Sequence, residues 1–337
     1  MSGTAADGET TAHWSLRPWI RPRTVALLLV AVVLAGVSAQ RSQVDRMLVL
    51  SAQAVGAAFG GERSQVADGL ARIGRDLLPL QLSETTDLAR LPELDRDRLP
   101  WGAHMERQAI SDRRLDPDTL EMTVVAGERE VLVQPYGYLM HVLWLMLQTL
   151  EIAFWGTVLA IAVGAPLALL GARGYSPHGA VLVAARGAAS FLRSIPDLIS
   201  ALFWVLAFGF GPIAGILALG LHTAGFLGKF FAEDIENAPG GPQDALRATG
   251  AGRLKVLRFA VLPQVMPSYL GYAQYILERN IRTATVIGIV GAGGIGQELK
   301  GRFEMFHFQH VATMLLVIFL TVLALELATG RARKRML

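Results

Sequence analysis

Long apolar runs dominate this sequence, and polar segments separate them. Most runs have about the 20 residues that a helix needs to cross the hydrocarbon core of a bilayer. Two interruptions are larger, a hydrophilic interval over residues 40–137 and a basic stretch over residues 232–262. The pattern predicts an all-α polytopic membrane protein with six transmembrane helices. The expected spans cover residues 24–39, 139–170, 180–210, 213–231, 265–295 and 311–329.

Two of these runs are irregular. Pro196 interrupts the third run, so we expect a kink there. The first run is short, follows several arginines and ends in Val37-Ser38-Ala39, as the apolar region of a signal peptide does. The alternative is an uncleaved first span, which Ile20 and snorkelling arginines lengthen, and we favour it.

The hydrophilic interval over residues 40–137 contains two expected elements. Apolar residues recur at helical spacing in Arg63–Leu78, which predicts an amphipathic helix at the membrane surface. Two β-rich runs, residues 120–125 and 131–133, flank Ala126–Arg129 and predict a hairpin that turns there. The interval serves either as a docking surface for an external partner or as a passive cap on the spans, and the sequence leaves both interpretations open.

Composition agrees with a membrane protein. The chain is 52% hydrophobic and 18% charged, with a mean hydropathy of +0.41. The absence of cysteine excludes disulfides, thiolate metal sites and cysteine nucleophiles. The seven histidines are scattered, so we expect no metal site and no cofactor in this chain. The sequence also lacks the GxxxxGK[ST] loop that binds ATP.

Charge predicts the orientation in the membrane. Lysine and arginine concentrate beside the spans in residues 1–23, at Arg173, over residues 229–258 and in residues 331–337. Six spans place all of these segments on one side, which the positive-inside rule identifies as the cytoplasm. We therefore expect a multi-pass protein of the plasma membrane with both termini cytoplasmic and residues 40–137 outside.

The basic stretch is typical of two short helices. Pro242 suits a first helical position, and Asp244 then lies in the first turn, where the helix dipole favours an acid. Gly250 follows the expected end of the first helix. Helical spacing resumes at Arg253 and runs towards the next apolar segment.

The fifth span contains a cluster of polar residues that is costly in a membrane. Glu278 and Arg282 stand four residues apart and form a good local ion pair, which accounts for Arg282 structurally. Arg279 has no acidic partner at such a spacing. With Asn280 and Thr283 it either lines an aqueous path and binds an oxyanion, or serves packing alone. Further polar positions inside spans face a pore or bond between helices: Gln148, Glu151, Asp197, His222 and Lys229.

A glycine-rich run ends the fifth span. Gly291, Gly293 and Gly296 match the dinucleotide fingerprint GxGxxG, which requires a preceding strand and a helix that begins at the motif. Here the flanking segments are apolar spans, so we reject nucleotide binding. The glycines instead permit close helix packing, or break the helix where backbone lines a cavity.

Two motifs resemble those of known transport proteins. Asp244-Ala245-Leu246, Gly250 and Leu262-Pro263 resemble the EAA loop of ABC importer permeases, with Asp in place of the usual Glu. The run ERNIRTATVIGIVGAGGIG over residues 278–296 resembles the fifth-span signature of the phosphonate ABC transporter permease family. With RIGRDLLP at residues 72–79 and RSIPDL at residues 193–198, the resemblance covers nearly all of residues 63–330. Methionine and osmolyte permeases share a similar glycine run but lack the adjoining Glu-Arg-Asn-Ile-Arg.

The resemblance implies an architecture and partners. We expect an ABC importer permease (MetI-like) core over residues 138–330, with a small extracytoplasmic insert, in a bacterial plasma membrane. The implied partners are a second permease chain in a homodimer, two cytoplasmic ATPase subunits that carry ATP and Mg, an extracytoplasmic substrate-binding protein and membrane lipid, but no nucleic acid. The implied substrate is a phosphonate or a related phosphorus oxyanion such as phosphite.

The same resemblance gives roles to residues, with no enzyme active site among them. The candidate ATPase-coupling residues are Asp244, Ala245, Leu246, Gly250, Leu262 and Pro263. The candidate substrate-pathway residues are Arg279, Arg282, Glu278, Asn280, Thr283 and Asp197. The alternatives are an ATP-independent channel or secondary transporter, and an ABC permease for methionine or another small solute. A secondary transporter favours internal inverted repeats, which the two halves do not show convincingly.

Overall fold

The computed structural model of the protein describes residues 22–58, 64–90, 99–100, 102–115 and 122–336. The chain forms two compact units, Met1–Arg75 and Asp76–Leu337. Most of the predicted N-terminal tail, residues 1–21, lies outside the described residues.

The first unit is helical. The first predicted span is found in α1 (Pro22–Arg41), and α2 (Val44–Ala58) follows at an angle of 67°. The third helix, α3 (Gln65–Leu77), confirms the amphipathic helix expected there. Its apolar side chains are exposed, with Leu70 at 62% and Ile73 at 56%.

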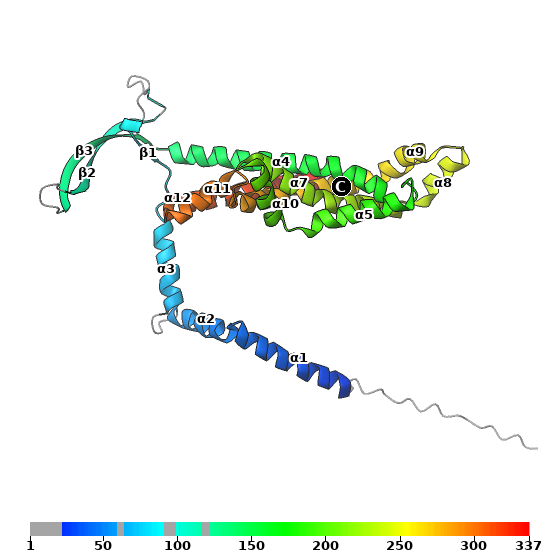
Figure 1. Ribbon diagram of the computed structural model, residues 1–337, viewed down its shortest axis with the longest axis horizontal. Coiled ribbons are helices and arrows are strands. Elements are labelled where there is room, and N and C mark those ends of the chain that lie inside the picture. Colours follow the sequence, from blue (N-terminus) through cyan, green and yellow to red (C-terminus); the bar gives the residue numbers. More distant parts are fainter. Residues whose placement is uncertain (1–21, 59–63, 91–98, 101, 116–121, 337) are drawn as a thin grey trace, which may run out of the picture. The chain divides into compact units, whose positions relative to one another are not determined.

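The second unit begins with a small antiparallel sheet (Figure 1). It contains β1 (Glu84–Asp87), the short 3-10 helix η1 (Leu88–Arg90), β2 (His104–Leu115) and β3 (Met122–Gln134). The strand order is β1-β3-β2, so β3 is central. The predicted hairpin is therefore wrong in its position.

Both predicted strands belong to β3, which runs unbroken through Ala126–Arg129. In the ladder, Ala126 pairs with Ser111 and Arg129 with Gln108. Cross-strand pairing along the whole of β2 outweighs the local turn preference of Gly127. Residues 116–121, which join the two strands, are outside the described residues.

A helical bundle forms the rest of the second unit (Figure 1). The longest helix, α4, occupies Gly137–Gly171 and confirms the second predicted span. The sheet precedes its first residue, and α8 and α9 lie at the other end of the bundle (Figure 1). The bundle helices are α4 (Gly137–Gly171), α5 (Gly179–Ser194), α6 (Asp197–Phe208), α7 (Pro212–Asn237), α8 (Gly240–Ala248), α9 (Arg253–Val256), α10 (Leu262–Gly288), α11 (Ile295–Glu304) and α12 (Phe308–Met336); the π-helical turn η2 (Leu257–Val261) joins α9 to α10.

Small residues let α4 and α7 pack closely. A Cβ at Gly164 would lie 2.9 Å from Cβ of Leu227 and 3.1 Å from the carbonyl oxygen of Ala224. Gly156 stands equally close to Leu219. Because lipid offers no hydrophobic drive for helix association, such close backbone approach is a main source of packing energy between membrane helices.

The third predicted span is broken rather than kinked. Helix α5 ends at Ser194 and α6 begins at Asp197, with 92° between their axes. Pro196 causes the break, because it lacks the amide hydrogen that would continue the helix and disfavours a helical conformation at the preceding residue. Ile195 accordingly adopts φ −84° and ψ 122°.

Two predicted helix ends need correction. The fourth span was expected to end near Phe231, but α7 continues to Asn237. Its last turns are held by Glu236, which accepts hydrogen bonds from the Arg186 side chain and the Arg173 amide. The fifth span was expected to reach Ile295, but α10 ends at Gly288 because a glycine-rich turn follows.

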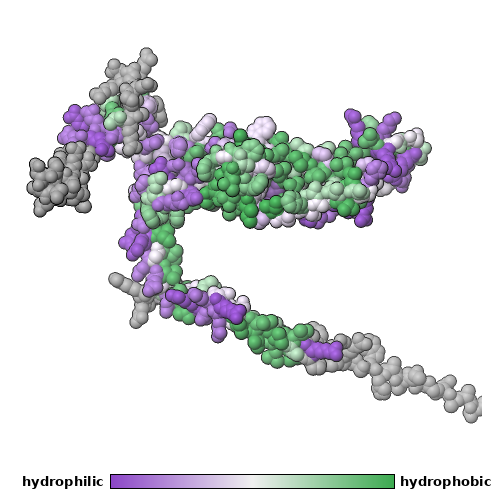
Figure 2. Space-filling view, viewed as in Figure 1, coloured by the Kyte–Doolittle hydropathy of each residue, from purple (hydrophilic) through white to green (hydrophobic). Residues whose placement is uncertain are grey.

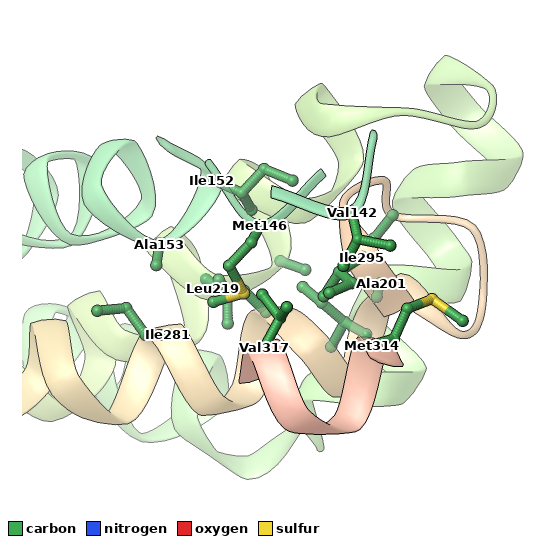
Figure 3. Packing of buried hydrophobic residues seen from close by; sticks show 14 of the residues in the cluster. Val142, Met146, Ile152, Ala153, Ala201, Leu219, Ile281, Ile295, Met314 and Val317 are labelled. Atoms are coloured by element: carbon green, nitrogen blue, oxygen red, sulfur yellow. The ribbon is translucent and has the colours of Figure 1, made fainter. Parts of the chain in front are cut away.

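Buried apolar side chains from α4, α6, α7, α10, α11 and α12 meet in one core cluster (Figure 3). Val142 of α4 lies beside Ile295 of α11, and the side chain of Met146, also from α4, runs towards Leu219 of α7 (Figure 3). The outer surface of this bundle is also largely apolar, and polar residues gather at α8 and α9 and around the sheet (Figure 2). A helix bundle that is apolar inside and outside suits a bilayer.

Length and hydropathy identify α4, α7 and α12 as helices able to cross a membrane. The bent pairs α1–α2 and α5–α6 each pass the same test as a pair. Helix α10 is too polar to be identified in this way, because it contains Glu278, Arg279 and Arg282. The described helices thus support a polytopic membrane protein with between three and five spans by composition alone.

Candidate functional site

Three polar side chains from different helices meet inside the bundle. Asp197 is the first residue of α6, directly after the break at Pro196. His222 lies in the middle of α7, and Arg279 lies in α10. We call Asp197, His222 and Arg279 the polar triad.

The triad is closely connected. Arg279 Nη2 donates to Asp197 Oδ2 at 3.2 Å and approaches His222 Nε2 at 3.3 Å. His222 Nε2 also lies 3.4 Å from Asp197 Oδ1, and its Nδ1 is 2.8 Å from the carbonyl oxygen of Ile195. The Arg279 guanidinium stands 5.1 Å from the ring centre of Phe226, at cation–π distance.

Burial makes this contact more costly to break than a surface ion pair. The side chains of His222, Asp197 and Arg279 are 8%, 19% and 28% exposed. The expectation that Arg279 lacks an acidic partner is wrong, because the break at Pro196 brings Asp197 to it. Arg279 and Asp197 neutralise each other, as polar groups inside a membrane require.

Asn280 faces the other way. Its side chain is 1% exposed, donates to Thr157 Oγ1 at 3.0 Å and accepts from Thr223 Oγ1 at 3.3 Å. These bonds join α10 to α4 and α7. The geometry therefore gives Asn280 a packing function and separates it from the neighbouring Arg279.

The remaining polar residues of α10 form local contacts. Arg282 donates to Glu278 at 2.9 Å, which confirms the predicted pair four residues apart. Thr283 bonds back to the carbonyl oxygen of Arg279 at 3.0 Å. Of the candidate pathway residues, the structure brings Arg279 and Asp197 together and leaves Glu278, Arg282, Asn280 and Thr283 outside the triad.

The glycine-rich run breaks α10 and is held by backbone contacts. Gly291, Gly293 and Gly294 have φ of 96°, 86° and 71°, where other residues are strained. The amide of Gly294 bonds to Gln148 Oε1 of α4 at 3.2 Å. The turn is thus bound tightly to its neighbours, which makes it a packing element between α10 and α11.

The basic stretch folds as predicted into two short helices, α8 and α9. Gly250, with φ of 79°, allows the turn between them. Asp244 is 73% exposed in its pair with Arg247, and Ala245 is also exposed. Leu262 and Pro263 begin α10, so they connect this stretch rigidly to the helix that carries Arg279.

A cavity lies between this stretch and the turn after α4. Its lining includes Arg173 and Tyr175 from that turn and Arg247 and Arg253 from the basic stretch. Burial raises the pKa of the Tyr175 hydroxyl, and the nearby Arg247 guanidinium opposes that rise. The shared lining places the basic stretch beside the carboxyl end of α4.

Two exposed apolar residues in this stretch were not among the predicted coupling residues. Leu254 is 79% exposed and Phe259 is 64% exposed, although both stand among basic residues. In the sequence, an apolar residue among basic ones was the feature that could have indicated these two positions. These two side chains are therefore candidates for a contact with another protein.

The chain is similar to a known family of membrane proteins. The family described as binding-protein-dependent transport system inner membrane component matches residues 142–336. The permease protein HtxE of Stutzerimonas stutzeri, whose provisional name places it in a phosphite transport system, is 49% identical over 259 residues, which are 77% of this chain and 99% of that protein.

Two further relatives are similar over about half of the chain. The phosphite transport system permease protein PtxC of Stutzerimonas stutzeri is 44% identical over 189 residues, or 56% of this chain and 69% of that protein. The phosphate-import permease protein PhnE of Mycolicibacterium smegmatis is 41% identical over 189 residues, or 56% of this chain and 36% of that protein.

A solved structure shares the fold. An inward-facing conformation of the MetNI methionine ABC transporter aligns with a TM-score of 0.50 and 23% identity, over 58% of this chain and 97% of that chain. At this identity the similarity concerns the arrangement of helices alone.

Proposed function

The chain belongs to the family of binding-protein-dependent transport system inner membrane components, and we propose that it is the permease of an ATP-driven importer for phosphite or a phosphonate. The single observation that supports an anionic substrate is the position of Arg279, whose guanidinium lies inside the bundle and contacts Asp197 and His222. A guanidinium binds a phosphorus oxyanion through paired hydrogen bonds. The names of HtxE and PtxC support the same class.

The transport step is an exchange of anions at Arg279. In the absence of substrate its charge is balanced by Asp197 at 3.2 Å. A substrate oxyanion that enters the pathway competes with that carboxylate for the guanidinium. The displaced carboxylate is then left without its partner, and the cost of that unpaired charge keeps binding reversible and favours release.

We further propose that the chain crosses the membrane six times, with both termini in the cytoplasm. The crossings are α1, α4, the broken pair α5–α6, α7, α10 and α12. In this topology the sheet lies outside and α8 and α9 lie inside, at opposite ends of α4. A helix of 35 residues is about 50 Å long, enough to separate the two faces.

The proposed partners follow from the family. A second copy of the chain forms the other half of the pathway, two ATPase subunits bind α8 and α9, and an external binding protein delivers substrate. ATP and Mg bind to the ATPase, and this chain is not catalytic. Asp244, Ala245, Leu246, Gly250, Leu262 and Pro263 are the proposed coupling residues.

Replacing Leu254 with Ser should weaken binding of the ATPase. Leu254 is 79% exposed, and burying a leucine side chain contributes about 2 kcal/mol, or roughly 30-fold in affinity. The measurement is the dissociation constant of the ATPase for the permease in nanodiscs. Leu78→Ser, at a leucine that is 63% exposed near the sheet, is the matched control and should leave that constant unchanged. Equal affinities for the two variants would exclude Leu254 from the contact.

The proposed function is tested by ATPase stimulation in liposomes that hold the assembled complex. Phosphite or methylphosphonate, delivered on the binding protein, should raise the rate several-fold over the basal rate, whereas methionine should not. Arg279→Gln should abolish the stimulation and the uptake of radiolabelled substrate. Arg282→Gln, three residues along the same helix, removes the local pair with Glu278; it is the matched control and should retain both.

Each other outcome has a definite meaning. If no ATPase copurifies with the chain, an ATP-independent channel or secondary transporter takes the place of the importer. If methionine stimulates and phosphite does not, the substrate class is wrong. If Arg279→Gln behaves as Arg282→Gln does, Arg279 is not a substrate contact.

A further inference from the structure

We propose that His222 is a positioning residue for Arg279, and that oxyanion binding at Arg279 is coupled to the uptake of one proton by His222. The inference rests on the proposed function, since it requires an anion to reach Arg279. Beyond the proposed function, it assigns a role to His222 and adds the uptake of one proton when the anion binds. The coupling follows from the hydrogen bonds of the polar triad.

The helix break fixes the tautomer of His222. Its Nδ1 lies 2.8 Å from the carbonyl oxygen of Ile195, which only accepts hydrogen bonds, so Nδ1 carries a hydrogen. In the neutral ring Nε2 is then an acceptor. Nε2 accepts a hydrogen bond from Arg279 Nη2, at a distance of 3.3 Å.

This arrangement leaves one acceptor of Asp197 without a donor. Oδ1 is buried and accepts no hydrogen bond from any group of the described residues, although His222 Nε2 lies only 3.4 Å away. With the neutral ring, two acceptor atoms face each other across that distance. A buried acceptor without a donor is costly and rare in folded proteins.

Protonation of His222 would satisfy Oδ1 but conflicts with Arg279. An imidazolium donates from Nε2 to Asp197, yet it then stands 3.3 Å from the guanidinium with no acceptor between them. The triad therefore has two alternative states. Either Arg279 or a protonated His222 pairs fully with Asp197.

Oxyanion binding selects the second state. When the oxyanion draws Arg279 away, the guanidinium no longer opposes protonation, and His222 takes a proton from water at Nε2. The Nε2–H then donates to Oδ1 of Asp197. A monoanion and a proton have then entered together, and the net charge of the site is unchanged. Arg279 forms a neutral pair with the anion, and the protonated His222 forms a neutral pair with Asp197. A low-dielectric site favours such neutral pairs.

Other charged groups around His222 are more distant from the ring. The helices packed against α7 are α4, α5, α6 and α10. Asp197 from α6 and Arg279 from α10 are the charged groups of the described residues that contact the ring within 4 Å. Among the described residues, the other acidic, basic and histidine side chains of these helices form no hydrogen bond or ion pair with the ring: His141, Glu151, Arg186, Arg193, Glu278 and Arg282.

The coupling has a definite sign. The anion-bound state holds one more proton than the free state, so affinity for the anion rises as the pH falls. The change is at most about tenfold per pH unit, for uptake of one full proton.

The experiment counts protons directly. Methylphosphonate is titrated calorimetrically into the permease–ATPase complex in nanodiscs, without binding protein, in two buffers of different ionisation enthalpy at about pH 7. The difference in heat gives the protons taken up per site. We expect His222→Gln to bind methylphosphonate but to take up fewer protons than the wild type, by a difference of between about half a proton and one proton.

Two comparisons make the count specific. Protonation of methylphosphonate itself contributes equally to wild type and variant, so the difference between them belongs to His222. His141→Gln removes another histidine of a membrane helix and should leave the wild-type count unchanged. His222→Asn is a second uncharged replacement of the ring; it should lower the count as His222→Gln does and provides the test if His222→Gln does not assemble.

The outcomes separate this inference from the proposed function. If wild type and His222→Gln bind methylphosphonate with the same proton count, the coupling is wrong and the importer stands. If the wild-type complex binds methionine but not methylphosphonate, the proposed substrate class itself is wrong. A reduced count in His141→Gln as well would assign the proton to a global change rather than to His222.

Discussion

Replacing Gly296 with Ala should prevent stable assembly of the membrane bundle. A Cβ at this position would overlap the carbonyl oxygen of Thr285 and lie 2.9 Å from Cα of Gly288. Both are backbone atoms of α10, so no side-chain rotation relieves the clash. Overpacking costs about 1–3 kcal/mol when side chains can adjust, and we expect at least about 3 kcal/mol here.

The measurement is thermal unfolding of the purified chain, followed by the fluorescence of its six tryptophans and by size-exclusion chromatography. Gly301→Ala is the matched control, because it lies on the same helix, α11, with nothing within 4 Å of the added Cβ. It should be neutral or gain about 0.5–1 kcal/mol from helix propensity. Equal stability of the two variants would contradict the close crossing of α10 and α11.

The bundle could be predicted from the sequence because membrane helices obey a simple rule. A segment that crosses a bilayer must be apolar over about 20 residues, and its hydrogen bonds are local. Helices α4 and α12 therefore lie where the apolar runs place them. The observed helix ends differ from the predicted ones where polar residues continue a helix, because the rule describes only apolar segments. In α7, charged last turns continue the helix beyond the apolar run to Asn237.

The sheet could not be predicted in detail because its contacts are not local. Gly127 favours a turn, but it stands opposite Ile110 in a ladder that runs from His104 to Leu115. The pairing energy comes from a partner strand that local patterns do not reveal. Register in such a strand is decided by the whole ladder.

The residues of the polar triad were among the polar positions singled out in the sequence, but their geometry was not predicted. Spacing along one helix revealed the pair of Glu278 and Arg282, four residues apart. It could not reveal that Asp197, 82 residues from Arg279, is the partner of that arginine. The consequence of Pro196 was underestimated, since the break it causes exposes the Ile195 carbonyl that orients His222 and brings Asp197 to Arg279.

Substitutions in the pair of Asp197 and Arg279 should separate its structural function from its function in transport. Asp197→Asn leaves the guanidinium without its counterion, and Arg279→Met leaves the carboxylate without one. The side chains are 19% and 28% exposed, so each single change should destabilise the bundle by about 3–5 kcal/mol. The double variant Asp197→Asn/Arg279→Met leaves no unpaired charge and should recover most of that stability, because the penalty of a lone buried charge is removed.

Transport should not recover with stability. The double variant, once assembled, should take up phosphite at a rate at least about 100-fold below wild type, a loss of about 3 kcal/mol for an interaction with a charged group. The matched pair is Glu278 and Arg282, whose side chains are 22% and 50% exposed. Its double variant with Gln at both positions should change stability by less than about 1 kcal/mol and leave uptake near wild type. If the double variant of Asp197 and Arg279 transported phosphite as well as that control, the pair would be a packing device alone, and the anion would have to bind elsewhere in the bundle.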